Sequence, residues 1–156
     1  MKRIPLIAIM LVTIALDQFT KHIARVALAM SAPRRYGILT LLYAENSGAF
    51  LSLGANLPPE TRSLIFSGVV AVALAVGMYA LMTNRIGGMG DSTAVAFILG
   101  GGIGNLIDRV ARGGRVSDFL YLAIGPLHTG VFNVADIAIT GGVIWLLISW
   151  LVAKKE

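Results

Sequence analysis

The sequence predicts a small, mainly α-helical membrane protein with four transmembrane helices and a small extramembrane sheet, and three observations support this fold class. Of the 156 residues, 56% are hydrophobic and only 13% are charged, about half the share of roughly 25% in soluble domains. The charged residues are spaced so that long uncharged runs lie between them. Low charge excludes a disordered chain, and the absence of cysteine excludes a disulfide scaffold. The length suits one domain over residues 1–156.

Four uncharged runs define the predicted spans. They contain 13 residues after Arg3, 22 after Arg62, 16 after Asp91 and 17 after Asp136, whereas a transmembrane helix needs about 20 apolar residues. Flanking residues therefore have to complete the shorter runs. We expect helices near residues 4–26, 62–83, 92–111 and 132–153.

The first span begins like a secretory signal peptide, with Lys2 and Arg3 before an apolar run. No small-residue cleavage site follows, and Asp17, Lys21 and Arg25 continue the helix at i, i+4, i+8 spacing, so we expect the helix to be retained. Four spans place both termini on one side. Basic residues outside the spans number five on each side, so the positive-inside rule gives no bias. The basic N-terminus favours cytoplasmic termini.

Two long connections, 27–61 and 112–131, fall on the side opposite the termini, whereas 84–91 makes a tight loop on the terminal side. The first contains an apolar run, 36–43, followed by turn residues, which predicts a small sheet. The second contains the apolar run 119–124 between glycine-rich turns, and we expect it to lie along the membrane interface.

The polar residues of the predicted spans gather on one side of the membrane. Ionisable residues in a membrane are costly and indicate a functional site by default. By chain direction, all of these residues lie on the side opposite the termini, so they form one layer. The layer comprises Asp17, Lys21, Asn46, Asn105, Asp108, Arg109, Asp118, Asn133 and Asp136.

Helical spacing groups these residues further. Asp17 and Lys21 stand at i, i+4 on one face, in the order that favours an ion pair, and we interpret them mainly as a structural clamp. Asn105, Asp108 and Arg109 share another face. For Asp108 with Arg109, a structural ion pair and a role in shaping a site both remain open.

Asp118 and Asp136 are the candidates for chemistry. Asp118 stands directly before an apolar run, and Asp136 lies in the first turn of the last span, where the helix dipole favours an anion. Two carboxyl groups that lie close together share a proton, which leaves one acid and one base near neutral pH. Such a pair activates water for attack on a peptide carbonyl. The 17 residues between them include turns that could bring the two together.

Other chemistries find less support. Without cysteine, and with only His22 and His128, the chain has no zinc-binding spacing. The Gly-x-Ser-Gly motif that some intramembrane proteases carry is absent. The glycines of 100–104 lie inside a span and are typical of close helix packing. We therefore expect neither a metal nor a cofactor.

Five motifs in order give the chain its resemblance to the bacterial lipoprotein signal peptidases, also called signal peptidase II. Together with the four spans they cover almost the whole chain, which makes the resemblance specific although each motif alone is weak. The motifs are Asp17-Gln18-Phe19-Thr20-Lys21, Asn46-Ser47-Gly48-Ala49-Phe50, Gly104-Asn105-Leu106-Ile107-Asp108-Arg109, Val116-Ser117-Asp118-Phe119 and Phe132-Asn133-Val134-Ala135-Asp136.

The resemblance implies roles for these residues. Asp118 and Asp136 would be catalytic, and Asp17 with Lys21 would be a supporting polar pair. In many members the phenylalanine corresponding to Phe50 stands one place later. The residues implied to bind substrate or shape the site are Asn46, Gly48, Asn105, Asp108, Arg109, Asn133 and Ala135.

The resemblance also implies a substrate and a location. An aspartic endopeptidase of this kind cleaves prolipoproteins that already carry diacylglycerol, just before the lipidated cysteine. It would be a monomer among the lipids of the inner membrane, with its site near the periplasmic or outer face. The first long connection would form a β-cradle, and the second would carry a mobile interfacial periplasmic helix.

Two other functions are compatible with a polar layer. One is a small proton-coupled transporter that uses Asp17, Lys21, Asp108 and Asp136 as a relay, although the apolar terminal half of every span disfavours a conduit. The other is a noncatalytic assembly factor, in which the layer only binds other helices.

Overall fold

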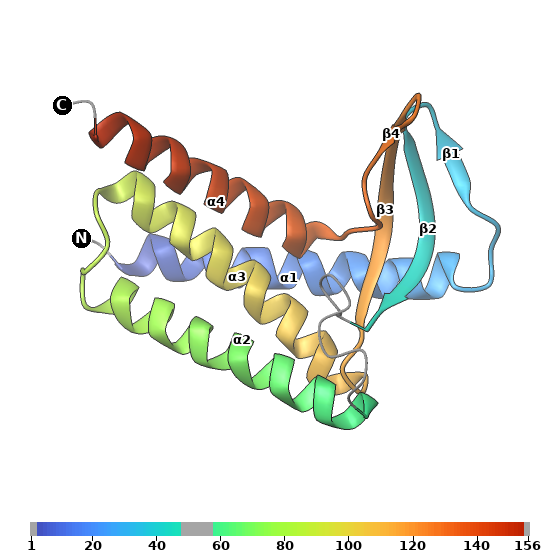
Figure 1. The fold of residues 1–156 in the computed structure, drawn as a ribbon, viewed down its shortest axis with the longest axis horizontal. Coiled ribbons are helices and arrows are strands. Elements are labelled where there is room, and N and C mark those ends of the chain that lie inside the picture. Colours follow the sequence, from blue (N-terminus) through green and yellow to red (C-terminus); the bar gives the residue numbers. More distant parts are fainter. Residues whose placement is uncertain (1–2, 48–57, 155–156) are drawn as a thin grey trace.

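The computed structural model describes residues 3–47 and 58–154. Figure 1 shows a bundle of helices with a small sheet at one end. Both chain ends lie at the other end of the bundle. In chain order the elements are α1 (Arg3–Leu28), β1 (Arg34–Tyr36), β2 (Leu39–Asn46), α2 (Pro59–Met82), α3 (Met89–Ala111), β3 (Val116–Ile124), β4 (Leu127–His128) and α4 (Val134–Ala153).

The helices begin and end close to the predicted ranges. Among the described residues, α1, α3 and α4 are long and apolar enough to cross a membrane, and Ser67–Met82 of α2 forms a shorter apolar helix. Proline in the first turn suits the start of α2, where its missing N–H costs nothing. Asn133 caps the start of α4. The chain is therefore a mainly helical membrane protein with a small antiparallel sheet.

Helix α3 lies against all three other helices, and its glycines permit the close approach. A Cβ on Gly101 would lie 2.5 Å from the carbonyl oxygen of Ala135 in α4. A Cβ on Gly100 would lie 2.8 Å from the Cβ of Thr13 in α1. Lipid is as apolar as a leucine side chain, so helices in a membrane associate through close packing of this kind.

The buried interior has two apolar parts separated by the polar layer. The cluster toward the chain termini contains the buried side chains of Leu6, Met10, Leu81, Ala96 and Leu99. The cluster between the end of α1 and the sheet contains the buried side chains of Ala24, Leu28 and Phe119.

The sheet has the order β1-β2-β3-β4, and every neighbouring pair is antiparallel. The central pair, β2 with β3, runs from Leu39 opposite Leu122 to Asn46 opposite Val116. Its strands run across the axes of the helices (Figure 1). This register brings the Asn46 end of β2 beside the start of β3, next to the polar layer.

The second long connection corrects one expectation. Residues 112–131 were expected to carry an interfacial helix, and instead they contain β3 and β4. The reason is that the aromatic and branched residues of β3 complete a sheet with β2, with the first four residues of β3 buried. A sheet was expected from the first connection alone, but each connection supplies half of it. Gly48 and Phe50 lie outside the described residues.

Candidate active site

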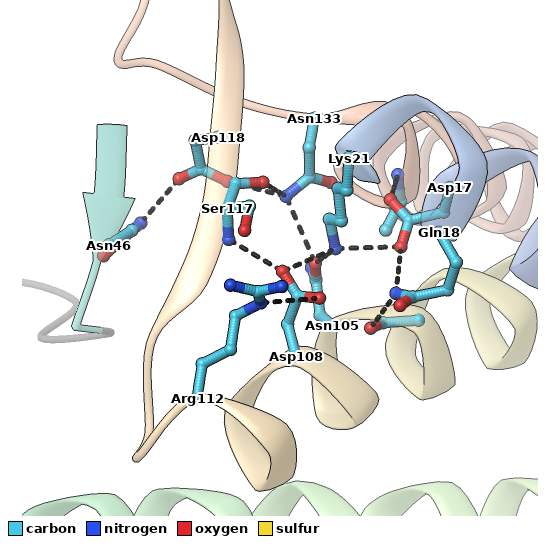
Figure 2. Close-up of polar contacts among 12 residues, drawn as sticks. Asp17, Gln18, Lys21, Asn46, Asn105, Asp108, Arg112, Ser117, Asp118 and Asn133 are labelled. Carbon is cyan, nitrogen blue, oxygen red and sulfur yellow. Dashed lines mark hydrogen bonds and ion pairs between the residues drawn. The ribbon is translucent and has the colours of Figure 1, made fainter. Parts of the chain in front are cut away.

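The polar residues meet where the second half of α1, the end of α3 and the starts of β3 and α4 converge (Figure 2). At its base, the Nζ atom of Lys21 lies 2.8 Å from Oδ2 of Asp17, and both side chains are fully buried. Oδ1 of Asp17 accepts a 3.0 Å hydrogen bond from the backbone N–H of Ala135. The predicted pair therefore ties α1 to the first turn of α4.

The start of α4 is held by a reciprocal cap. Oδ1 of Asn133 accepts from the backbone N–H of Asp136 at 3.0 Å, and Oδ2 of Asp136 accepts from the backbone N–H of Asn133 at 3.1 Å. Such a capping box satisfies two of the free N–H groups at a helix start. Because the cap occupies the amide oxygen of Asn133, its NH2 group faces away from the helix and donates to Oδ1 of Asp118 at 2.6 Å. One asparagine therefore contacts both candidate acids.

Asp118 is almost completely buried, with 2% of its surface exposed. Besides the bond from Asn133, its Oδ2 accepts from the side-chain NH2 of Asn46 at 3.1 Å. Burial raises the pKa of Asp118 to about 6, with a further rise from the charge of Asp136, although the two amide hydrogen bonds oppose it. Asp118 therefore keeps its proton to a higher pH than an ordinary aspartate does.

Asp136 is more accessible than Asp118. Its Oδ1 accepts a 2.9 Å hydrogen bond from the NH2 group of Asn105. It also lines a cavity of about 390 Å³ with Thr129, Phe132 and Thr140. The two acids therefore differ, since one is buried behind amides and the other faces open space.

Lys21 decides which way the Asn105 amide points. Its Nζ donates to Oδ1 of Asn105 at 2.7 Å, and the NH2 group of Asn133 donates to the same oxygen at 3.2 Å. An ammonium group can only donate. The NH2 group of Asn105 must therefore face Asp136, to whose Oδ1 it donates a hydrogen bond.

Asp108 joins the end of α3 to the start of β3. Its Oδ2 accepts from the backbone N–H of Ser117 at 2.8 Å, one residue before Asp118. Its charge lies near three cations, at 3.8 Å from Lys21, 3.7 Å from Arg25 and 3.8 Å from Arg112. Asp108 therefore helps to position Asp118 by holding the backbone of the preceding residue.

Arg109 does not pair with Asp108. No carboxylate of the described residues lies within ion-pair distance of Arg109, which is half-buried at the end of α3. The charges of Asp136, Asp118 and Asp108 still act on its guanidinium group. Of the two roles left open for Arg109, the geometry disfavours a clamp through Asp108.

Sequence reasoning missed some residues of the site. Arg25 and Arg112 neighbour Asp108, and Gln18 links Asp17 to the carbonyl oxygen of Gly104 through bonds of 3.2 and 3.0 Å. Helical spacing was an available signal, because Arg112 follows Asp108 at i+4. Gly48 is the one predicted site residue outside the described ranges.

A second, larger cavity of about 470 Å³ lies between α3 and α4 and adjoins the first. Both are lined by Ile137 and Gly141, and the larger extends to Phe97 and Trp145. Its lining is almost entirely apolar. Within residues 3–47 and 58–154, no three His, Asp or Glu side chains gather as metal ligands.

A family model described as signal peptidase (SPase) II matches residues 9–152. The chain belongs to the signal peptidase II family. A lipoprotein signal peptidase from Syntrophus aciditrophicus is 36% identical over 143 residues, covering 90% of this chain and 88% of the relative. One from Francisella tularensis subsp. mediasiatica is 37% identical over 146 residues, covering 92% and 89%.

A solved structure described as a bacterial membrane enzyme shares the fold of this member of the signal peptidase II family. Its TM-score is 0.80 at 26% identity, and the match covers 94% of this chain and 92% of the other. Family membership makes the chain an aspartic-type peptidase of the bacterial inner membrane. It also decides against the transporter and the assembly factor.

Proposed function

We propose that Asp118 and Asp136 are the acid and the base with which the protein removes signal peptides from prolipoproteins. Membership of the signal peptidase II family carries the reaction itself. The finer assignment is supported by one observation: Asn133 contacts both carboxyl groups, through its NH2 group to Asp118 and through its backbone N–H to Asp136.

The proposed acid is Asp118, because its pKa is raised to about 6 by burial. The proposed base is Asp136, which accepts two hydrogen bonds and lines the cavity. Two carboxyl groups in different environments can hold opposite protonation states at one pH.

The proposed reaction has two steps. Asp136 takes a proton from water as the water oxygen bonds to the scissile carbonyl carbon, and Asp118 gives its proton to the carbonyl oxygen. The carbon–nitrogen bond then breaks as Asp136 protonates the leaving nitrogen. Asp118 regains a proton from the diol, so both acids return to their starting states.

The substrate proposed for this site is a prolipoprotein already modified with diacylglycerol, cut just before the lipidated cysteine. The apolar cavity that extends from Ile137 to Trp145 adjoins the one at Asp136, and it suits a hydrophobic segment that approaches from the membrane. Asn46, Asn105, Arg109 and Asn133 would shape the site around the scissile bond.

We further propose α2 as a fourth span, with both termini in the cytoplasm and the site near the periplasmic or outer face. Arg62 and Arg85 bracket 22 uncharged residues in this part of the chain, long enough to span about 30 Å of hydrocarbon. We also propose that the protein acts as a monomer.

The test is a gel-shift cleavage assay in detergent with a diacylglyceryl-modified prolipoprotein. We expect Asp118→Asn and Asp136→Asn each to lose activity by about 10²- to 10⁴-fold or more, the share that acid–base catalysis contributes. Asp91→Asn is the matched control. Asp91 accepts a hydrogen bond from Trp145 at the start of α3, on the side of the chain termini and far from the site, so its carboxylate should be dispensable for cleavage. Wild-type turnover by either dyad variant would exclude this assignment.

A further inference from the structure

The end of the sheet farthest from Asn46 presents large apolar side chains that the proposed reaction does not use. Tyr36, Ile38, Ile124 and Leu127 are 59%, 54%, 64% and 75% exposed. We call these four side chains the sheet tip. Several exposed apolar side chains gathered at one place indicate an interaction surface rather than ordinary protein surface.

The tip is one continuous surface made by two turns. The backbone N–H of Ala123 donates to the carbonyl oxygen of Ile38 at 2.9 Å, which joins the β1–β2 turn to the last part of β3. Gly37 and Gly125 adopt positive φ angles of 61° and 58°, so each turn reverses the chain tightly. Figure 1 shows both turns together at the upper end of the sheet.

The charges around the tip have one sign. Arg34 and Arg35 are exposed on β1, and the Nε atom of Arg35 donates to the carbonyl oxygen of Gly37 at 3.1 Å. No aspartate or glutamate occurs in residues 29–44 or 119–135. The tip therefore combines apolar side chains with cations, a combination that favours an anionic lipid surface.

The tip also lies beside the membrane-facing side of the helices. The strands cross the helix axes and project past α4 (Figure 1). The outward side chains of α4, such as Ile144 and Ile148, are about half exposed, as expected for contact with lipid. Only residues 129–133 separate β4 from α4, so the tip cannot lie far from the point where α4 enters the membrane.

We propose that the sheet tip is seated in the headgroup region of the bilayer beside α4. The four apolar side chains then face the acyl boundary, and Arg34 and Arg35 meet lipid phosphates. Tyrosine is typical of this interface. A protein partner that adds a strand is a poorer fit, because the edge strands β1 and β4 have only three and two residues.

The inference depends on the membrane location of the family and not on the catalytic roles of Asp118 and Asp136, so its test needs no cleavage. The chain has no cysteine, and a single introduced cysteine therefore carries a unique nitroxide label. Pro126→Cys places the label in the β3–β4 turn and leaves all four tip side chains in place. Met30→Cys is the control, because Met30 is fully exposed but lies between α1 and β1.

Both labelled proteins are placed as full chains in lipid nanodiscs of phosphatidylcholine with phosphatidylglycerol. We expect the label at position 126 to be several-fold less accessible to a water-soluble nickel chelate than the label at position 30, and more accessible to lipid-dissolved oxygen. Adding Ile124→Ser and Leu127→Ser should raise nickel access at position 126 several-fold. Unchanged melting of these variants would establish that they fold.

The charge part of the inference is tested separately. With both arginines present, omitting phosphatidylglycerol from the nanodiscs should raise nickel access at position 126. In the Arg34→Gln and Arg35→Gln variant, nickel access should be the same with and without phosphatidylglycerol. Equal nickel access at positions 126 and 30 would overturn the proposal. Spin–spin broadening at position 126 that disappears on dilution with unlabelled protein would also overturn it, in favour of contact between two copies.

Discussion

The two ends of the helical bundle are built from the same helices but are held together differently. Toward the termini, α1 and α3 meet through apolar side chains such as Leu6 and Leu99. Toward the sheet, the same two helices meet through Lys21 and Asn105, which are joined by a 2.7 Å hydrogen bond. The end near the termini is held by apolar packing, and the end near the sheet is held by directed polar contacts.

The difference shows where structural uniqueness resides in this membrane protein. Apolar packing tolerates small shifts and rotations, because lipid can replace a lost contact. A buried polar group that loses its partner has nothing to replace it in a medium without water. The polar end therefore sets the rotation and register of the helices, and the candidate acids lie there.

A change at the polar end should have the largest effect after the loss of either acid. Lys21→Met is made together with Asp17→Asn, so that no buried carboxylate is left without a counter-charge. Without the ammonium donor, only the longer 3.2 Å bond from Asn133 still fixes the orientation of the Asn105 amide. We expect kcat to fall by about 10- to 100-fold, the cost of a misplaced catalytic group, with little change in KM.

Asp17→Asn alone is the control for this variant. It keeps the contact between Lys21 and Asn105 but weakens the link to Ala135, so the melting temperature should fall more than kcat. If the double variant keeps the wild-type kcat, Lys21 is structural and does not position Asn105.

Arg109→Ala should separate activity from stability. The guanidinium group makes no ion pair with the described carboxylates, so its loss should leave the melting temperature nearly unchanged while activity falls at least about tenfold, as for a lost site-directed charge. Arg112→Ala is the matched control, because Arg112 lies 3.8 Å from Asp108 and should mainly affect stability. Parallel losses of activity and melting temperature in Arg109→Ala would instead indicate a clamp.

A change in the apolar packing should instead lower stability and leave activity intact. A Cβ on Gly142 would lie 2.7 Å from the backbone oxygen of Ala94, which cannot move without shifting α3. We expect Gly142→Ala to lower stability by about 1–3 kcal/mol, with kcat of the folded protein preserved. Gly68→Ala is the control, because a Cβ there meets nothing within 4 Å. The measurement is thermal unfolding in one detergent.

The smallest effect should be a pH-dependent gain in stability in Asp118→Asn. In the folded protein the pKa of Asp118 is raised to about 6, whereas an unfolded aspartate titrates near 3.9. The folded state therefore binds more protons between these values, and stability from this group is lost as the pH rises through 6. The variant should gain a few degrees in melting temperature over wild type at pH 7.5, and much less at pH 4.

Local features of the sequence were sufficient for the helices and for the single polar layer. Uncharged runs show where a chain can enter lipid, and helical spacing places Asp17 with Lys21 and Asn105 with Asp108. These are short-range properties, and neither depends on the neighbours that a segment meets in space. The motif order was sufficient for the family.

Tertiary structure alone decided the partners. Asp108 neighbours Lys21, Arg25 and Arg112 rather than Arg109, and the 112–131 connection joins β2 instead of forming a helix. The sequence showed Asn133 beside Asp136 but not that its amide reaches Asp118. Such contacts arise between segments far apart in the chain, and which donor meets which acceptor is settled only when helix packing brings them within about 3 Å.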